Sequence, residues 1–282
     1  MRRGVYFLAN DTVYEQAVAF LSSFRRFNPT IPLRLVPFAD NVERVAALAS
    51  RFSFDVWQRP ELLRECDDIS KRFHGEVAGQ YRKLAMWSGE FDEFVYIDCD
   101  TVVLHSIDLV FPHLANFDFI VSNSNVPDAR RWVWRDSILR ARALSPRQIS
   151  FAANTGFVGS KRGLLDMDTV RAKLDRALAL APHMELLCRE QPLLNYLIVT
   201  SGRPHTSLLA MMVVSGDMSI PLERWGGADI GVVRDGQVVT PEGGSPTLLV
   251  HWAGEFQKVR SESGRIPHHE LWSYYRDLVP QA

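Results

Sequence analysis

The sequence predicts an α/β protein with a mixed, mostly parallel sheet flanked by helices. Strand-like and helix-like segments alternate from residue 4 to residue 58, which is typical of βαβ units with right-handed crossovers. A later apolar run, 94–97, has the β-branched and aromatic composition of a buried strand. With 282 residues, of which 46% are hydrophobic, the chain is long enough for one large domain with a substantial core.

The first half of the chain opens on a strand at residues 4–9. Apolar residues then recur on one face of a helix from Val13 to Phe24, and Asn10 or Asp11 is expected to cap it. The other elements expected in this half are strands at 32–38 and 54–58 and helices at 42–52, 62–73 and 75–89.

The second half is expected to continue in the same style and to end in hairpins. The basic, tryptophan-bearing stretch 129–144 predicts a surface helix or a lid. Gly156 interrupts the strand-like stretch 149–159, and a glycine inside a strand often marks a close approach of the backbone. From residue 221, glycine pairs and short β-runs favour hairpins. The remaining expected elements are strands at 118–121, 208–214 and 247–252 and helices at 107–114, 165–180, 189–200 and 267–278.

Charge and composition argue against several classes of function. The net charge of -1 gives no bulk attraction to nucleic acid. No apolar run approaches the roughly 20 residues that span a bilayer, although the arginines in 130–142 leave peripheral membrane contact as an alternative to a solvated helix face. The scattered Cys66, Cys99 and Cys188 form neither a disulfide framework nor a zinc pattern, so we expect a cytoplasmic protein. The sequence predicts no oligomeric state.

Two carboxylates, Asp98 and Asp100, follow the central strand with Cys99 between them. A buried carboxylate is costly unless it is paired or bound to a metal. Ligands of open α/β sheets bind at the carboxyl ends of strands, where two acids suit a hard divalent cation that brings phosphate oxygens with it. From these three residues alone, an ordinary loop with solvated acids is the commoner explanation, so the flanking sequence must decide.

Three further patterns flank the acids. Arg82 and Lys83 precede them and would suit phosphate oxygens, or equally a solvated helix face. Glu190 and Gln191 begin an expected helix, where an acid also complements the helix dipole. His251 follows the last strand; a lone histidine is more often structural, but imidazole is a common third ligand beside carboxylates.

Together these segments resemble glycosyltransferase family eight, which includes glycogenin, bacterial lipopolysaccharide galactosyl- and glucosyltransferases, and galactinol synthases. The resemblance spans roughly residues 4–258 and keeps the family's order. The stretches that carry it are Val5–Asp11 with Tyr14, Arg82–Leu104, Asn154–Phe157, Glu190–Asn195 and His251–Gly254.

The resemblance implies a GT-A fold that binds a nucleotide sugar and transfers its hexose. Residues 1–220 would form the nucleotide-sugar-binding catalytic domain, and residues 221–282 would complete the same domain as a small β/helix extension. The expected donor is a UDP-sugar, the acceptor is a saccharide or another hydroxyl compound, and the anomeric configuration is retained. The implied cofactor is Mn²⁺ or Mg²⁺, held by Asp98, Asp100 and His251.

The other site residues follow from the matching motifs. Asn154, Glu190 and Gln191 would line the sugar pocket beside the reacting carbon. Because Gln191 is a poor nucleophile, front-face attack by the acceptor is the simpler mechanism. We interpret the Cys99 side chain as packing, although Cys99 lies in the donor-binding segment. The expected donor-contacting residues are Ala9, Asn10, Asp11, Tyr14, Arg82, Lys83, Asp98, Cys99 and Lys258.

The sequence departs from the family pattern at two positions and leaves two other functions open. Glu190 stands where the family usually has Asp, and Lys258 lies one residue after the family's lysine. A nucleotidyltransferase that makes the nucleotide sugar is one alternative, but the loop after the first strand, 9–12, lacks the glycines of that class. A non-catalytic protein that binds a nucleotide or its sugar is the other.

Overall fold

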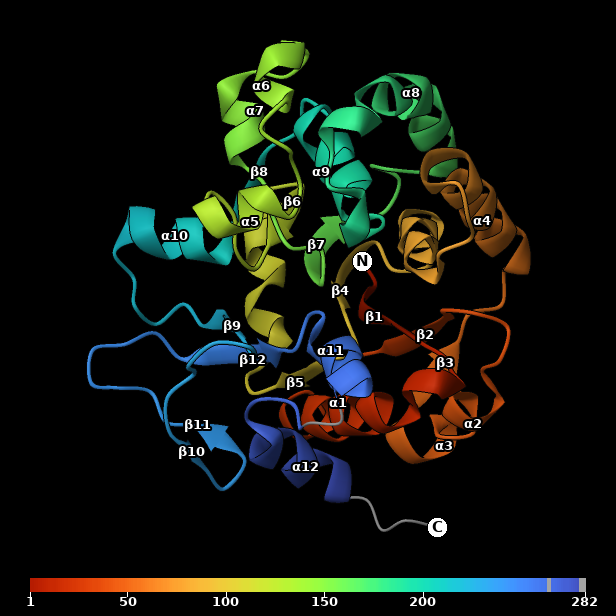
Figure 1. Ribbon diagram of the computed structural model, residues 1–282. Helices are drawn as coiled ribbons and strands as arrows, with labels where there is room; N and C mark the ends of the chain where they lie inside the picture. Colours follow the sequence, from red (N-terminus) through yellow and green to blue (C-terminus); the bar gives the residue numbers. More distant parts are fainter. Residues whose placement is uncertain (263–264, 279–282) are drawn as a thin grey trace.

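The computed structural model describes residues 1–262 and 265–278, without the side chains of 259–262. Its centre is a seven-stranded sheet with the order β3-β2-β1-β4-β7-β6-β8 (Figure 1). All neighbouring strands of this sheet are parallel except at β7, which is antiparallel to both β4 and β6. The mixed, mostly parallel sheet predicted from the sequence is therefore confirmed. Its strands are β1 (Arg3–Ala9), β2 (Leu33–Pro37), β3 (Phe54–Val56), β4 (Glu93–Ile97), β6 (Phe119–Val121), β7 (Phe157–Lys161) and β8 (His205–Ser207).

A smaller sheet, with the order β5-β12-β9, lies beside the large one. Its strands are β5 (Thr101–Val103), β9 (Leu222–Trp225) and β12 (Thr247–His251), with β12 antiparallel to β5 and parallel to β9. Since β4 ends at Ile97 and β5 begins at Thr101, the turn of Asp98, Cys99 and Asp100, called the acidic turn below, passes from one sheet to the other. A short hairpin of β10 (Val233–Arg234) and β11 (Gln237–Val238) lies between β9 and β12 in the chain. The domain boundary at residue 220 stays a prediction.

Alternate residues of β1 point to two separate cores, one on each face of the large sheet. Val5 and Phe7 belong to a core shared with α1, α2 and α3, and Tyr6 and Leu8 to a core shared with α4, α8 and α9. Figure 1 shows these two helix groups on opposite sides of β1 and β2. The helices are α1 (Tyr14–Phe27), α2 (Glu43–Ala46), α3 (Ala49–Phe52), α4 (Pro60–His74), α5 (Pro127–Arg131), α6 (Ile138–Ala141), α7 (Pro146–Ser150), α8 (Met167–Leu180), α9 (Gln191–Val199), α10 (Leu208–Ser215), α11 (Glu255–Glu262) and α12 (His269–Asp277).

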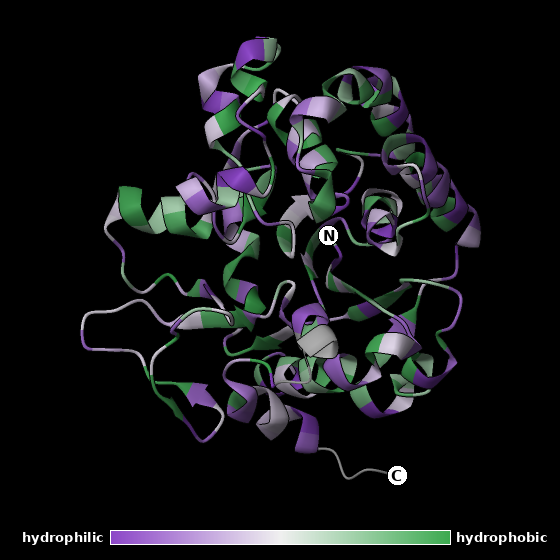
Figure 2. Ribbon diagram, viewed as in Figure 1, coloured by the Kyte–Doolittle hydropathy of each residue, from purple (hydrophilic) through white to green (hydrophobic). Residues whose placement is uncertain are grey.

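The strand predicted at 208–214 is wrong, because the segment forms the helix α10. Ser207 caps this helix: its Oγ accepts a hydrogen bond from the Ala210 amide at 3.0 Å. Gly216, with φ of 70°, ends it in the left-handed conformation that glycine favours. Figure 2 shows α10 as hydrophobic along most of its length. None of the described helices has the length and the apolar character that crossing a bilayer requires.

Expectations for four other segments and for one helix cap need correction. The helix expected at 42–52 is divided into α2 and α3, and the one expected at 75–89 is a 3-10 helix over Gly79–Ser88. The stretch 129–144 contains the end of α5 and all of α6 instead of one helix. The stretch 149–159, expected to be strand-like, contains the end of α7 as well as the start of β7. Neither Asn10 nor Asp11 caps α1 with its side chain.

Candidate metal centre

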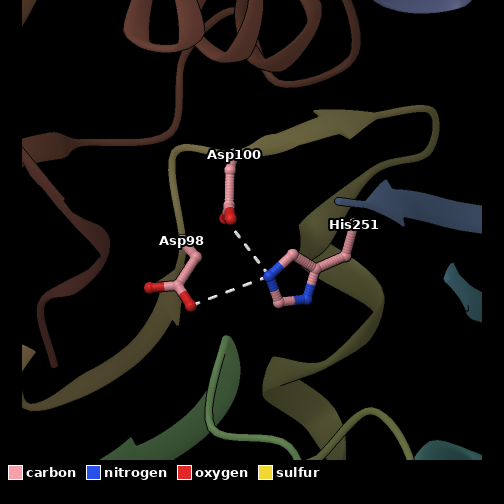
Figure 3. A group of neighbouring side chains, drawn as sticks. All are labelled: Asp98, Asp100 and His251. Carbon is pink, nitrogen blue, oxygen red and sulfur yellow. Dashed lines mark ion pairs between the residues drawn. The ribbon is translucent and has the colours of Figure 1, made fainter. Parts of the chain in front are cut away.

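Asp98, Asp100 and His251 meet where the two sheets join, with both carboxylates near the imidazole (Figure 3). His251 Nε2 lies 3.2 Å from Asp100 Oδ1 and 3.8 Å from Asp98 Oδ2. One ligand atom from each residue lies within 4.8 Å of the others. The aspartate side chains are 26% and 25% exposed whereas the His251 side chain is only 2% exposed, so solvent reaches the site from the carboxylate side.

Backbone and side-chain hydrogen bonds hold the acidic turn in place. The Asp98 amide donates to the Gly156 carbonyl at 2.8 Å, and the Trp252 amide donates to the Asp100 carbonyl at 3.0 Å. Thr101 Oγ1 donates to the Asp98 carbonyl at 2.7 Å, and the Tyr96 hydroxyl donates to the Asp98 carboxylate. The turn is therefore tied to strands of both sheets, which fixes the direction of its two carboxylates.

Gly156 leaves the space that the site needs. A Cβ on this residue would lie 2.3 Å from His251 Cε1 and 2.8 Å from Asp98 Oδ2, closer than real contacts. The close approach expected from a glycine in this stretch is thus an approach to the side chains of the site.

The sequence did not single out Glu223, which contacts the histidine from β9. Its Oε1 accepts a hydrogen bond from His251 Nδ1 at 2.9 Å, and its other oxygen accepts one from the Ser122 hydroxyl. Glu223 lies in a stretch that we expected to form hairpins. Only the parallel pairing of β9 with β12 brings it beside His251, and no local pattern signals that pairing.

The charges of the cluster suit a divalent cation. Burial alone would lower the pKa of His251, but the carboxylates of Asp100 and Glu223 raise it well above its usual value. Burial would raise the pKa of Asp100, yet His251 lowers it. Three acids thus surround one imidazole. Carboxylate oxygens and an imidazole nitrogen are accepted ligands of Mn²⁺ and Mg²⁺, so these residues fit such an ion.

Lys83 lies next to this cluster and is itself buried. Its Nζ donates to Glu190 Oε1 at 2.6 Å, lies 3.1 Å from Asp98 Oδ1 and sits 4.8 Å from the centre of the Tyr96 ring. Burial alone would lower the pKa of Lys83, but the carboxylates of Asp98 and Glu190 raise it above its usual value. The ammonium therefore links the acidic turn to the start of α9.

The expected sugar-pocket residues gather beside this ion pair. Gln191 Oε1 accepts from the Thr155 amide at 3.2 Å, and its Nε2 donates to the Trp132 carbonyl at 3.0 Å. Asn154 Oδ1 accepts from the Gly156 amide at 2.7 Å, and the Thr155 hydroxyl donates to Glu190 at 2.9 Å. Glu190 and Gln191 therefore contact the segment 154–156, which includes Asn154 and whose Gly156 carbonyl accepts from the Asp98 amide.

The expected donor contacts near the amino terminus form a second group at the carboxyl end of β1. The Ala9 carbonyl accepts from the Phe38 amide at 2.9 Å, and Asn10 Nδ2 donates to Asn41 at 3.1 Å. Both oxygens of Asp11 accept backbone amides at the start of α2, from Arg44 at 3.1 Å and Val45 at 3.0 Å. The Tyr14 ring lies 4.3 Å from the Arg44 guanidinium.

Arg82 and Lys258 extend the two groups. Arg82 is buried, is paired with Asp67 at 2.8 Å, and donates to the Pro37 carbonyl at 3.1 Å, which connects it to the carboxyl end of β2. Lys258 Nζ lies 2.6 Å from Glu255 and 5.6 Å from the centre of the Trp225 ring. Trp225 is the residue of β9 that pairs with His251, so Lys258 lies on the histidine side of the site.

Cys99, between the two aspartates, is only partly buried and packs against the core that contains Val5 and Phe7. The structure thus supports the interpretation of its side chain as packing. Cys66, Cys99 and Cys188 are free thiols.

Solved glycosyltransferase structures resemble this chain, whereas no protein-family model and no curated protein matches its sequence. The bifunctional glycosyltransferase WbbM aligns with a TM-score of 0.60 and 12% identity over 99% of this chain and 50% of its own. The galactosyltransferase LgtC, in complex with donor and acceptor sugar analogues, aligns with a TM-score of 0.55 and 11% identity over 99% of this chain and 97% of its own. The apo form of GlyE from Streptococcus pneumoniae TIGR4 aligns with a TM-score of 0.51 and 12% identity over 98% of this chain and 60% of its own.

At these identities the likeness shows the fold. The chain has the GT-A fold of these glycosyltransferases, as the sequence resemblance implied. It spans half the length of WbbM and nearly all of LgtC.

Proposed function

We propose that this chain is a metal-dependent glycosyltransferase of family eight. In this proposal it moves a hexose from a UDP-sugar to a hydroxyl of a saccharide or similar acceptor and retains the anomeric configuration. The observation that carries the proposal is the cluster of Asp98 and Asp100, which follow β4, with His251, the last residue of β12. The GT-A fold supports it, and one neighbour with that fold, LgtC, holds donor and acceptor sugar analogues.

Asp98, Asp100 and His251 would hold Mn²⁺ or Mg²⁺, and such an ion would supply positive charge for the departing diphosphate. Lys83 keeps the Asp98 carboxylate in place and adds positive charge next to it. Lys83 would reach the donor from this buried position between Asp98 and Glu190.

The transfer itself would occur beside the start of α9. Both polar ends of the Gln191 amide bond to backbone groups, which fixes the side chain in place. Because an amide is also a poor nucleophile, Gln191 would orient the sugar and would not attack it. The acceptor oxygen would then bond to the anomeric carbon on the face from which the diphosphate leaves, and its proton would pass to the leaving phosphate. Asn154 and Glu190 would line the pocket, and the reacting carbon gains oxocarbenium character as the bond breaks.

The donor nucleotide would lie along the carboxyl ends of β1 and β2. Ala9, Asn10, Asp11 and Tyr14 would contact the base and ribose, with Arg82 behind them and Lys258 and Cys99 near the diphosphate. The free cysteines support a reducing, cytoplasmic location.

The test is hydrolysis and transfer of a panel of UDP-sugars with Mn²⁺, measured as released UDP. Asp98→Asn is expected to abolish turnover, whereas Asp128→Asn, a change at an exposed acid, should leave it unchanged. Turnover that survives EDTA or Asp98→Asn would overturn the proposal. Pyrophosphate release from UTP and a sugar phosphate would instead identify a nucleotidyltransferase. Tight UDP binding without turnover across donors and acceptors would identify a binding protein.

A further inference from the structure

We propose that Glu223 is a positioning residue that fixes His251 for metal binding through Nε2. The proposal rests on the metal site of the proposed function and adds a residue that the sequence resemblance did not assign. Glu223 would not touch the cation or the substrate. It would act only through the imidazole.

The geometry defines which imidazole nitrogen is available. Nδ1 of His251 lies 2.9 Å from Glu223 Oε1, whereas Nε2 faces Asp100 at 3.2 Å and Asp98 at 3.8 Å. An ionised carboxylate only accepts hydrogen bonds, so Nδ1 must carry the proton. In the neutral ring the lone pair is then on Nε2, on the side of the two aspartates.

A hydrogen bond to its second carboxylate oxygen also holds Glu223 in place. The Ser122 hydroxyl donates to its second oxygen, Ser122 is fully buried, and Glu223 is 9% exposed. Ser122 follows β6 of the large sheet, while Glu223 and His251 belong to adjacent strands of the small sheet. The carboxylate therefore cannot turn away from the imidazole without leaving the Ser122 hydroxyl unpaired in the interior.

A second edge of the ring, at Cε1, is restricted too. Cε1 lies only 2.3 Å from the position that a Cβ on Gly156 would take, so the Gly156 backbone is close to the imidazole. The Gly156 backbone and Glu223 thus restrict two adjacent edges of the ring. A carboxylate that merely balanced the charge of the cluster would not need this directed contact with Nδ1.

The test measures Mn²⁺ alone, without nucleotide or sugar, on the full chain. In wild-type protein, electron paramagnetic resonance should give a dissociation constant, and the nitrogen coupling of a bound imidazole should be resolved. Glu223→Ala is expected to weaken Mn²⁺ binding about 10–100-fold and to reduce or alter that coupling. Glu223→Gln keeps an oxygen that accepts from Nδ1, so it should restore part of the affinity. Glu93→Gln, a change at a similarly buried acid at the other end of β4, should bind Mn²⁺ like the wild type.

The outcomes separate this proposal from the proposed function. If Asp98→Asn loses Mn²⁺ while Glu223→Ala binds it like the wild type with the same nitrogen coupling, the positioning role is overturned and the metal site stands. If wild type and Asp98→Asn bind Mn²⁺ equally weakly, both fall. If Glu223→Ala does not fold, Glu223→Gln and Ser122→Ala carry the test, and unchanged affinity and coupling in both would overturn the role.

Discussion

Lys83 Nζ lies 3.1 Å from Asp98 Oδ1, so one of the three candidate metal ligands already has a buried cation as its partner. Lys83 also bonds to Glu190, which makes a single ammonium the counter-charge of two carboxylates. The ion pair connects the acidic turn after β4 to the start of α9 and leaves Asp98 positioned before any ligand binds.

Removal of this cation should destabilise the protein. Lys83→Met leaves Asp98 and Glu190 without their partner, and breaking a buried pair in this way costs about 3–5 kcal/mol. The free energy of unfolding in urea measures the loss. Lys71→Met, at an exposed ion pair, should change it by less than about 1 kcal/mol. Adding Glu190→Gln to Lys83→Met should recover part of the stability, and a double variant no better than the single one would contradict this account.

Gly156→Ala should impair the metal site more than the fold. The added methyl group would overlap His251 Cε1 and press on Asp98, so we expect weaker Mn²⁺ binding and at least a tenfold loss of turnover. Gly159→Ala, in β7 just after Gly156, is the matched control, since its Cβ would lie 3.1 Å from Val110 Cγ1 and away from the site. Equal effects of the two changes on Mn²⁺ affinity would argue against the role given to Gly156.

Asp11 should prove to be a stability residue, whatever its part in donor binding. Asp11→Ala removes the acceptor of two amides at the start of α2 and should cost about 0.5–2 kcal/mol in the free energy of unfolding. Asp11→Asn keeps one acceptor oxygen and should lose less. A direct contact with the nucleotide would also raise the KM for the UDP-sugar in both variants, so unfolding and kinetics together separate the two roles.

The Cys188 thiol should react slowly near neutral pH. Burial raises its pKa to about 11, so the reactive thiolate is scarce at pH 8 and increases as the pH rises toward that value. The rate of modification by a disulfide reagent, followed from pH 7 to pH 10 with Cys188→Ser as the control, should therefore rise with pH throughout. A plateau below pH 9 would contradict the raised pKa. Cys66 is fully buried and should react only after unfolding.

The sequence predicted the parts of this fold that local pattern determines. The strands from β1 to β4, the acidic turn and the last strand with His251 were all readable from apolar periodicity and motif order. The strand expected at 208–214 failed because Ser207 and Gly216 supply helix caps, and these two residues outweigh the strand-like composition between them. Asp11 looked like a cap for the helix that follows it, but its carboxylate bonds to α2 across the loop.

The sequence did not predict the contacts that depend on pairing between strands far apart in the chain. Glu223 meets His251 only because β9 lies parallel to β12, and the pairing of β12 with β5 brings His251 to the acidic turn. Lys83 was expected near phosphate, and the structure shows that it is first a partner of Asp98 and Glu190. Nothing in the spacing of these residues distinguishes a buried ion pair from a solvated helix face.

The acidic turn belongs to both sheets, and this has a consequence for synthesis of the protein. Asp98 and Asp100 are translated before His251, and they gain this third partner only after β12 has been made and has added to β5. A nascent or truncated chain that ends before β12 would carry both aspartates without His251, and so without the third residue of the candidate metal centre. If the proposed function holds, such a chain would lack turnover until β12 has paired with β5.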